Sequence, residues 1–360
     1  MRTASSALGA LVGRDWRRAL GSRVLVPELS ARLAGVKAGG EASWAARTFA
    51  RSLSLSLLAG SGTRWQASLA AARAEGRLSP SQMSFDPAAP RGLFPVADFV
   101  TADRDSSIPI AAYSIAAVSG LGDHVIVIRD HEAEIRREVL GPLGLEEKDW
   151  RFAVQEAPFG KPLGHGDAAW QSRALWRDAD WVVANFGGDA NSRFTVEASL
   201  LALAALDAAG EGVDFLLPAA LLSEPAYPIA LDGEGLPLSF GHAKLQGAES
   251  GAGRGPSREG LANVGLRLYR AKALAEVLED LRDSYWVEGR GYAIPGNDPA
   301  SGECALDNAD AVFAGRGRAR VLAIARPREL SPAKTFDEIP RFEASIAEVL
   351  AEDRILLPAF

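Results

Sequence analysis

Cysteine is nearly absent from this sequence, because the 360 residues contain only Cys304. A single thiol excludes a disulfide within the chain and a zinc cluster built on cysteines. Histidine is also scarce, and none of the four histidines stands four residues from another, which is the spacing of two zinc ligands on one helix. The lack of a cysteine pair fits a reducing compartment, so we expect a cytoplasmic protein.

Long apolar runs and an excess of positive charge are missing as well. No run of about 18 apolar residues occurs, so the sequence predicts no transmembrane helix and no membrane partner. The start, MRTASSALGALVGRDWRR, has only a short apolar patch; an organelle transit peptide is a second interpretation of it. The net charge of -7 and the pI of about 5.3 give no basic face for nucleic acid.

The composition is that of a globular protein, and strand-like and helix-like segments alternate along most of the chain. This alternation predicts an α/β fold, a Rossmann-like mixed and mostly parallel sheet with helices on both faces. We expect three parts: an N-terminal helical extension over residues 1–50, one large domain over 51–350, and a C-terminal tail over 351–360. Residues 75–96 are expected to form a long irregular loop.

The most informative short stretch is SLSLSLLAGSGTRW, residues 52–65, an apolar strand that enters a glycine loop. Glycines at the carboxyl end of a strand let the backbone approach a phosphate, and Arg64 would add a charged donor. Trp65 stands at the third glycine position of the dinucleotide fingerprint, and no Gly-Lys-Ser/Thr follows, so neither common phosphate-loop motif is present. Taken alone, the loop fits a phosphate site and a purely steric turn equally well.

The chain resembles the nucleotidyltransferases that make nucleoside-diphosphate sugars, including the N-acetylglucosamine-1-phosphate uridylyltransferase type. The signature of that family, Leu-Ala-x-Gly-x-Gly-Thr-Arg, corresponds to LLAGSGTRW, with one residue fewer before the second glycine. The later Pro-Lys and Leu-Pro-Val correspond to PRGLFPV, where Arg91 replaces the lysine. The resemblance implies that Arg64 and Arg91 are catalytic and that the loop binds nucleotide through Leu58, Ala59, Gly60, Ser61, Gly62 and Thr63.

Further motifs follow in the order of the family. VQEAPFGKPLGHG resembles its base-recognition segment, which implies that Gln155, Gly164 and His165 bind the nucleotide and that Gly166 lets the base lie on the backbone. VVANFGGDA resembles the strand whose final Asp binds the metal, here Asp189. The position of the second metal ligand is Lys334, a cation that can replace part of the charge of a second ion or mark the loss of that role.

The acceptor side of the resemblance is carried by ANVGLRLY, which resembles the Asn-Thr-Gly strand that contacts the sugar. His242 and Lys244 stand where members carry an acid, which favours an acceptor with extra negative charge or one without a sugar ring. Asp167 is a candidate cap for the following helix, and Asp307 is expected to be solvated. The acceptor-binding candidates are Tyr227, His242, Asn263, Gly265 and Glu303.

The resemblance covers about residues 52–350 and implies a Mg²⁺-dependent transfer of a nucleoside monophosphate from a nucleoside triphosphate to a sugar 1-phosphate or similar phosphorylated small molecule. Two alternatives stay open. The first is a non-catalytic nucleotide or sugar-nucleotide binding protein, which the exchanges at Arg91 and Lys334 favour. The second is a glycosyltransferase, although Asp189 is followed by Ala190 and Asn191 and lacks the second carboxylate of an Asp-x-Asp motif. The sequence predicts neither the base, the acceptor nor the oligomeric state.

Overall fold

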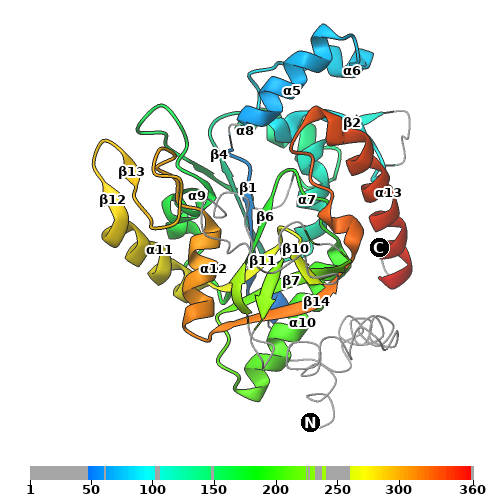
Figure 1. Ribbon diagram of the computed structural model, residues 1–360. Helices are drawn as coiled ribbons and strands as arrows, with labels where there is room; N and C mark the ends of the chain where they lie inside the picture. The colour runs from blue at the N-terminus through cyan, green and yellow to red at the C-terminus, as the bar shows by residue number, and fades with distance from the viewer. Residues whose placement is uncertain are drawn as a thin grey trace.

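The chain folds around one mixed β-sheet flanked by helices (Figure 1). The computed structural model describes residues 48–60, 62–101, 106–146, 150–223, 225, 228–231, 237–240 and 260–357. Within these residues the sheet has eight strands in the order β10-β7-β11-β6-β1-β4-β5, with β14 also paired to β7. The strands are β1 (Ser52–Leu57), β4 (Asp123–Ile128), β5 (Trp150–Val154), β6 (Trp181–Phe186), β7 (Phe215–Leu222), β10 (Gly260–Asn263), β11 (Arg267–Arg270) and β14 (Ala319–Ala325).

The pairing of these strands is mixed and mostly parallel, as predicted. Strand β1 lies parallel to both β4 and β6, β4 is parallel to β5, and β14 is parallel to β7. Strand β11 runs antiparallel to β6 and β7, and β10 antiparallel to β7. The expected α/β class is therefore confirmed, and the arrangement is consistent with a Rossmann-like fold.

The helices cover both faces of the sheet (Figure 1). One face packs against α9, α11 and α12, and the other against α7, α10 and α13. Helix α5 follows β1. The longer helices are α5 (Thr63–Ala74), α7 (Ile110–Val118), α9 (His165–Gln171), α10 (Arg193–Ala209), α11 (Ala271–Tyr285), α12 (Leu306–Gly315) and α13 (Ile339–Leu356). None of the helices in the described part of the chain combines the length and the apolarity that a membrane crossing requires.

Short elements fill the connections. The region expected to be an irregular loop contains α6, η1 and β2, which pairs with β3 ahead of α7. Strands β8 and β9 pair antiparallel. The short elements are α6 (Pro80–Met83), α8 (Glu132–Glu134), the 3-10 helices η1 (Arg91–Leu93), η3 (Arg173–Leu175), η4 (Pro327–Leu330) and η5 (Phe336–Glu338), the π-helix η2 (Ile135–Leu140), and strands β2 (Pro95–Ala97), β3 (Ser107–Pro109), β8 (Ile229–Leu231), β9 (Pro237–Phe240), β12 (Trp286–Val287) and β13 (Gly291–Tyr292).

Strand β1 is buried on both faces, although leucine and serine alternate along it. The leucines belong to the core that α9 and α11 cover. On the opposite side, Ser56 donates to Oδ1 of Asn185 at 2.9 Å, and Ser54 bonds Nδ1 of His124 at 2.8 Å. Because each buried hydroxyl has a partner, the serines fit a central strand without an unpaired polar group.

The two ends of the chain were predicted to form an extension and a tail. Most of the predicted N-terminal extension, residues 1–47, lies outside the described residues. The predicted tail begins inside α13, which continues to Leu356 and buries Asp353. Residues 351–356 are therefore part of the folded domain.

Candidate functional site

The candidate site lies where the strand order reverses. From β1 the chain continues through β4 to β5 on one side, and it then returns to β6 on the other side of β1. In an open α/β sheet, ligands bind at the carboxyl ends of the strands that flank such a reversal. The glycine loop follows β1, and Gly187, Gly188 and Asp189 follow β6. The topology therefore places both predicted segments at one edge.

The glycine loop presents backbone rather than side chains. Leu58 and Ala59 are buried, and the N–H of Leu58 donates to the carbonyl oxygen of Val127 at 2.8 Å. Gly60 is exposed, and a Cβ there would meet no atom within 4 Å. Gly62 has a φ of +58° and leads into α5, which begins at Thr63. The first turn of α5 therefore begins at the loop, and its leading N–H groups, which have no partner within the helix, suit an anion.

Asp189 lies among cationic side chains from three different segments. Burial raises the pKa of its carboxyl, while Lys334, Arg91 and Arg267 act in the opposite direction. The carboxylate lies directly above Gly265, because a Cβ on that glycine would overlap Oδ2 of Asp189. Three residues predicted from separate motifs, Asp189, Gly265 and Lys334, are therefore neighbours in the structure.

Arg91 reaches the same place from η1. Its guanidinium packs on the backbone of Gly188, where a Cβ would lie 2.5 Å from an Nη atom. Burial lowers the pKa of Arg91, Asp189 and Glu338 oppose this shift, and the charge of Arg64 adds to it. Arg64 itself is exposed at the start of α5. Two arginines thus border the glycine loop, one half-buried and one facing solvent.

The segment that carries Lys334 is attached to the Asp189 loop. The N–H of Ala333 donates to the carbonyl oxygen of Gly188 at 2.9 Å. The N–H of Lys334 donates to a carboxylate oxygen of Glu338 at 2.7 Å. These two bonds hold the lysine backbone beside the loop that follows β6.

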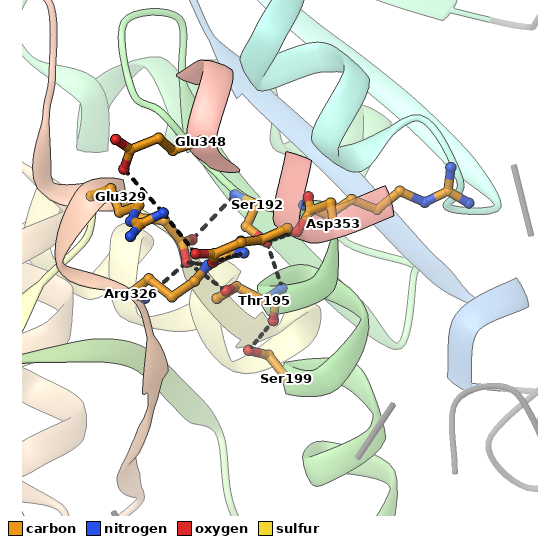
Figure 2. Close-up of polar contacts among 10 residues, drawn as sticks. Ser192, Thr195, Ser199, Arg326, Glu329, Glu348 and Asp353 are labelled. Carbon is orange, nitrogen blue, oxygen red and sulfur yellow. Dashed lines mark hydrogen bonds and ion pairs between the residues drawn. The ribbon is translucent and has the colours of Figure 1, made fainter. Parts of the chain in front are cut away.

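A buried polar network fixes the other end of that loop (Figure 2). The N–H of Ser192 donates to Glu329 at 3.2 Å, and its hydroxyl donates to Asp353 at 2.7 Å. Thr195 donates its hydroxyl to Glu329 at 2.8 Å, while Arg326 donates to Asp353 at 2.9 Å. The start of α10 is therefore tied to η4 and α13, and this network anchors the loop without entering the site.

The predicted base-recognition residues contact one another and a distant loop. Nε2 of Gln155 donates to the carbonyl oxygen of Gly164 at 3.0 Å and to Oδ2 of Asp167 at 3.2 Å. A Cβ on Gly164 would lie 2.5 Å from the carbonyl oxygen of Cys304, and one on Gly166 would lie 2.9 Å from the same atom. Close packing on residues 304–305 already requires glycine at both positions, whether or not a base also lies there.

His165 and Glu303 belong to this second group rather than to the Asp189 group. Nδ1 of His165 accepts a hydrogen bond from the N–H of Leu306 at 2.9 Å, at the start of α12. The ring of His165 lies edge-on to Phe186, with centroids 4.9 Å apart. Glu303 is half-buried and lies against Gly164. Phe186, at the end of β6, therefore stands between the Gln155 side and the Asp189 side.

Asn263 acts through the backbone of Gly265. Its Oδ1 accepts from the N–H of Gly265 at 2.8 Å, which stabilises the turn beneath Asp189. Three other predicted residues, Ser61, Tyr227 and His242, as well as Lys244, lie outside the described residues, and the side chain of Thr63 is not described.

Arg267 is a functional candidate that the motifs did not reveal. Its buried guanidinium donates to Asp307 at 3.0 Å, to Asp310 at 2.9 Å and to the carbonyl oxygen of Gly265 at 3.2 Å. Burial acts to lower the pKa of Arg267, but the two carboxylates outweigh it and raise the pKa.

The expectation that Asp307 is solvated is wrong, because it is buried in this ion pair. The expected cap by Asp167 is also wrong, since its buried carboxylate accepts from other side chains.

The residues near Asp189 could hold Mg²⁺ only if phosphate oxygens and water complete the coordination shell of the ion. Among the described residues no three His, Cys, Asp or Glu side chains converge as a metal cage. Mg²⁺ in phosphate-handling sites takes one or two carboxylates and completes its shell with phosphate oxygens and water. The single carboxylate of Asp189 would meet that requirement if the neighbouring glycine loop held phosphates.

Replacing Gly265 by alanine is expected to destabilise the protein by about 2 to 3 kcal/mol, because strained backbone and steric overlap add. The φ of Gly265 is +87°, and the new methyl group would overlap Asp189. Gly289→Ala is the matched control, since Gly289 has a φ of +75° and a Cβ there would meet no atom within 4 Å. Urea unfolding measures both variants, and equal losses would contradict the close contact with Asp189.

No family model matches the chain, and a search of the curated proteins finds no match.

Proposed function

We propose that this protein is a nucleotidyltransferase that moves a nucleoside monophosphate from a nucleoside triphosphate to a sugar 1-phosphate or similar phosphorylated small molecule. The observation that carries the proposal is the meeting of the glycine loop, Arg91, Asp189, Gly265 and Lys334 at the switch point of the sheet. These residues stand far apart in the sequence, in the order of the motifs that resemble the family, with Arg91 and Lys334 as exchanges at two of its positions. Their convergence is what that resemblance requires.

The reaction asks the protein for alignment and charge neutralisation more than for covalent chemistry. An oxygen of the acceptor phosphate attacks the α-phosphorus, and the bond to the leaving pyrophosphate breaks. The backbone N–H groups at the start of α5, with Arg64 and Arg91, would hold the triphosphate. The acceptor phosphate is already ionised, so no general base is needed.

The cations around Asp189 would hold the two phosphates close together despite their like charge. Lys334 and Arg91 flank the carboxylate, and Arg267 supports the Gly265 turn below it. When bound, Mg²⁺ held by Asp189 and phosphate oxygens would supply further neutralisation of negative charge. Gln155, two strands away from the glycine loop, would contact the base.

The test is pyrophosphate release by purified protein with Mg²⁺, each of the four nucleoside triphosphates and a panel of phosphorylated acceptors. We expect release that depends on both the triphosphate and one class of acceptor. An absence of release under every combination would remove the catalytic proposal.

A non-catalytic nucleotide-binding protein is the second candidate. It is favoured by Arg91 and Lys334, which surround Asp189 with positive charge where the family has a lysine and a second metal ligand. Calorimetry that shows saturable nucleotide binding, together with no turnover in the assay above, would favour this function over the first.

A further inference from the structure

We propose that Asp167 is a positioning residue: it fixes the amide of Gln155 with the oxygen directed toward the nucleotide, so that the site selects a base edge that offers an N–H donor. This inference rests on the proposed nucleotide binding and adds what the base must present. Asp167 itself would touch neither the base nor the phosphates.

Asp167 is fully buried and joins four elements of the fold. Its Oδ2 accepts from Nε2 of Gln155 at 3.2 Å and from Nε2 of Gln171 at 2.7 Å. Its Oδ1 accepts from the hydroxyl of Tyr292 at 2.9 Å and lies 3.6 Å from Nη1 of Arg282. With donors on both oxygens, the carboxylate cannot rotate without losing several bonds at once.

Arg282 is itself held rigidly. Its guanidinium lies between the rings of Trp170 and Trp286, at 3.8 and 3.9 Å from the two centroids. Phe159 stacks on Trp286 in turn. Stacking on two aromatic faces restrains the arginine, and the arginine in turn restrains Oδ1 of Asp167.

The surroundings of Gln155 decide which way its amide faces. Nε2 is within bonding distance of two pure acceptors, the Asp167 carboxylate and the carbonyl oxygen of Gly164. A flipped amide would direct its oxygen at both of them, so the usual ambiguity between amide N and O does not arise here. Both hydrogen bonds that the amide forms with the described residues use Nε2, and neither uses Oε1. Gln155 can therefore offer a ligand an acceptor, but not a donor.

The position of Gln155 suits a base. It follows β5, which is separated from β1 by β4 alone, so it stands about 10 Å from the glycine loop along the sheet edge. A nucleotide whose phosphates occupy the glycine loop can span that distance. A base edge with an imino or amino N–H meets Oε1 favourably, and an edge with only acceptors meets repulsion.

The test compares nucleotide binding with binding of a ligand that has phosphates and no base. Calorimetry measures the affinities of the four nucleoside triphosphates and of tripolyphosphate for the full-length protein, for Asp167→Asn and for Asp178→Asn. Asp178 is exposed and supplies the matched control. In Asp167→Asn an amide NH₂ that faces the two glutamines would meet their donors, and one that faces the other side would meet the Arg282 cation. Either orientation weakens the hold on Gln155 and leaves the carbonyl oxygen of Gly164 as its firm acceptor. A second variant, Gln155→Met, removes the amide and leaves the Asp167 carboxylate in place.

The measured quantity is the ratio of two affinities, that of the nucleoside triphosphate that binds wild type most tightly and that of tripolyphosphate. This preference is expected to fall about tenfold in Asp167→Asn and in Gln155→Met, as for the loss of one hydrogen bond. Tripolyphosphate affinity should stay within about twofold, and Asp178→Asn should match the wild type. Retained preference in Asp167→Asn or in Gln155→Met would overturn this inference alone. Equal losses for nucleotide and tripolyphosphate would do the same, since they indicate a purely structural role. If the wild-type protein binds no nucleotide better than tripolyphosphate, both this inference and the proposed function fall.

Discussion

Asp189→Asn is expected to lower pyrophosphate release by roughly 100-fold or more, the usual scale for removing one charged group from a transition-state site. The asparagine keeps the shape of the side chain, but it removes the negative charge that Lys334, Arg91 and Arg267 surround. Without that charge the three cations should bind tripolyphosphate more tightly in the absence of Mg²⁺. Steady-state release assays and metal-free calorimetry measure the two effects.

The control for this substitution is Asp280→Asn, an exposed aspartate on α11. It should leave both release and binding unchanged. Because burial raises the pKa of Asp189, the ionised form should be lost at a higher pH than for an ordinary aspartate. The acid limb of the wild-type pH profile is therefore expected above the usual aspartate range. Unchanged activity in Asp189→Asn would exclude the role proposed for the carboxylate.

Arg267→Met is expected to destabilise the protein by about 3 to 5 kcal/mol, because it leaves the buried carboxylates of Asp307 and Asp310 without their cation. It also removes the donor to the carbonyl oxygen of Gly265, so the turn beneath Asp189 loses support. Urea unfolding followed by circular dichroism measures the loss.

The pH dependence of the stability of Arg267→Met gives an independent check. Burial already raises the pKa of Asp310 to about 6, and Arg267 is the group that most opposes this rise. Without the arginine the pKa rises further, so the folded variant holds a proton that the unfolded chain releases. Stability of Arg267→Met should therefore increase as the pH falls from 8 to 5, relative to the wild type.

The control is an arginine whose own side chain is exposed. Arg318 donates to Asp214 at 2.8 Å, and its side chain is 44% exposed. Arg318→Met is expected to cost less than about 1 kcal/mol, since solvent screens such a pair. Similar losses for Arg267→Met and Arg318→Met would contradict the burial and the coupling described for Arg267.

The sheet and the meeting of Asp189 with the glycine loop could be predicted, because both depend on local sequence pattern and on the direction of the strands. Apolar runs that end in glycine or aspartate identified β1 and β6, and the carboxyl ends of parallel strands necessarily share one edge of the sheet. Asp189 and the glycine loop could therefore be placed together. Lys334 and Gly265 were found only through the order of motifs, since nothing local to them indicates a neighbour.

The residues that prediction missed depend on contacts between distant segments. Nothing near Asp307 indicates burial, because its partner Arg267 lies on another element. The glycines at 164 and 166 suggested a base, but their nearest atoms belong to residues 304–305. Asp167 resembled a helix cap, whereas it accepts hydrogen bonds from Tyr292, Gln155 and Gln171 and pairs with Arg282 of α11. Tertiary packing decides these roles, and a single sequence does not display it.

Phosphorus NMR of the complete reaction tests the central claim most directly. The protein is incubated with Mg²⁺, a nucleoside triphosphate and the acceptor that gives the fastest pyrophosphate release. We expect pyrophosphate and a product with a new pair of diphosphodiester resonances in equal molar amounts, with one nucleoside triphosphate and one acceptor phosphate consumed for each. Orthophosphate without the new pair of resonances, or no change in the spectrum, would contradict the proposed transfer.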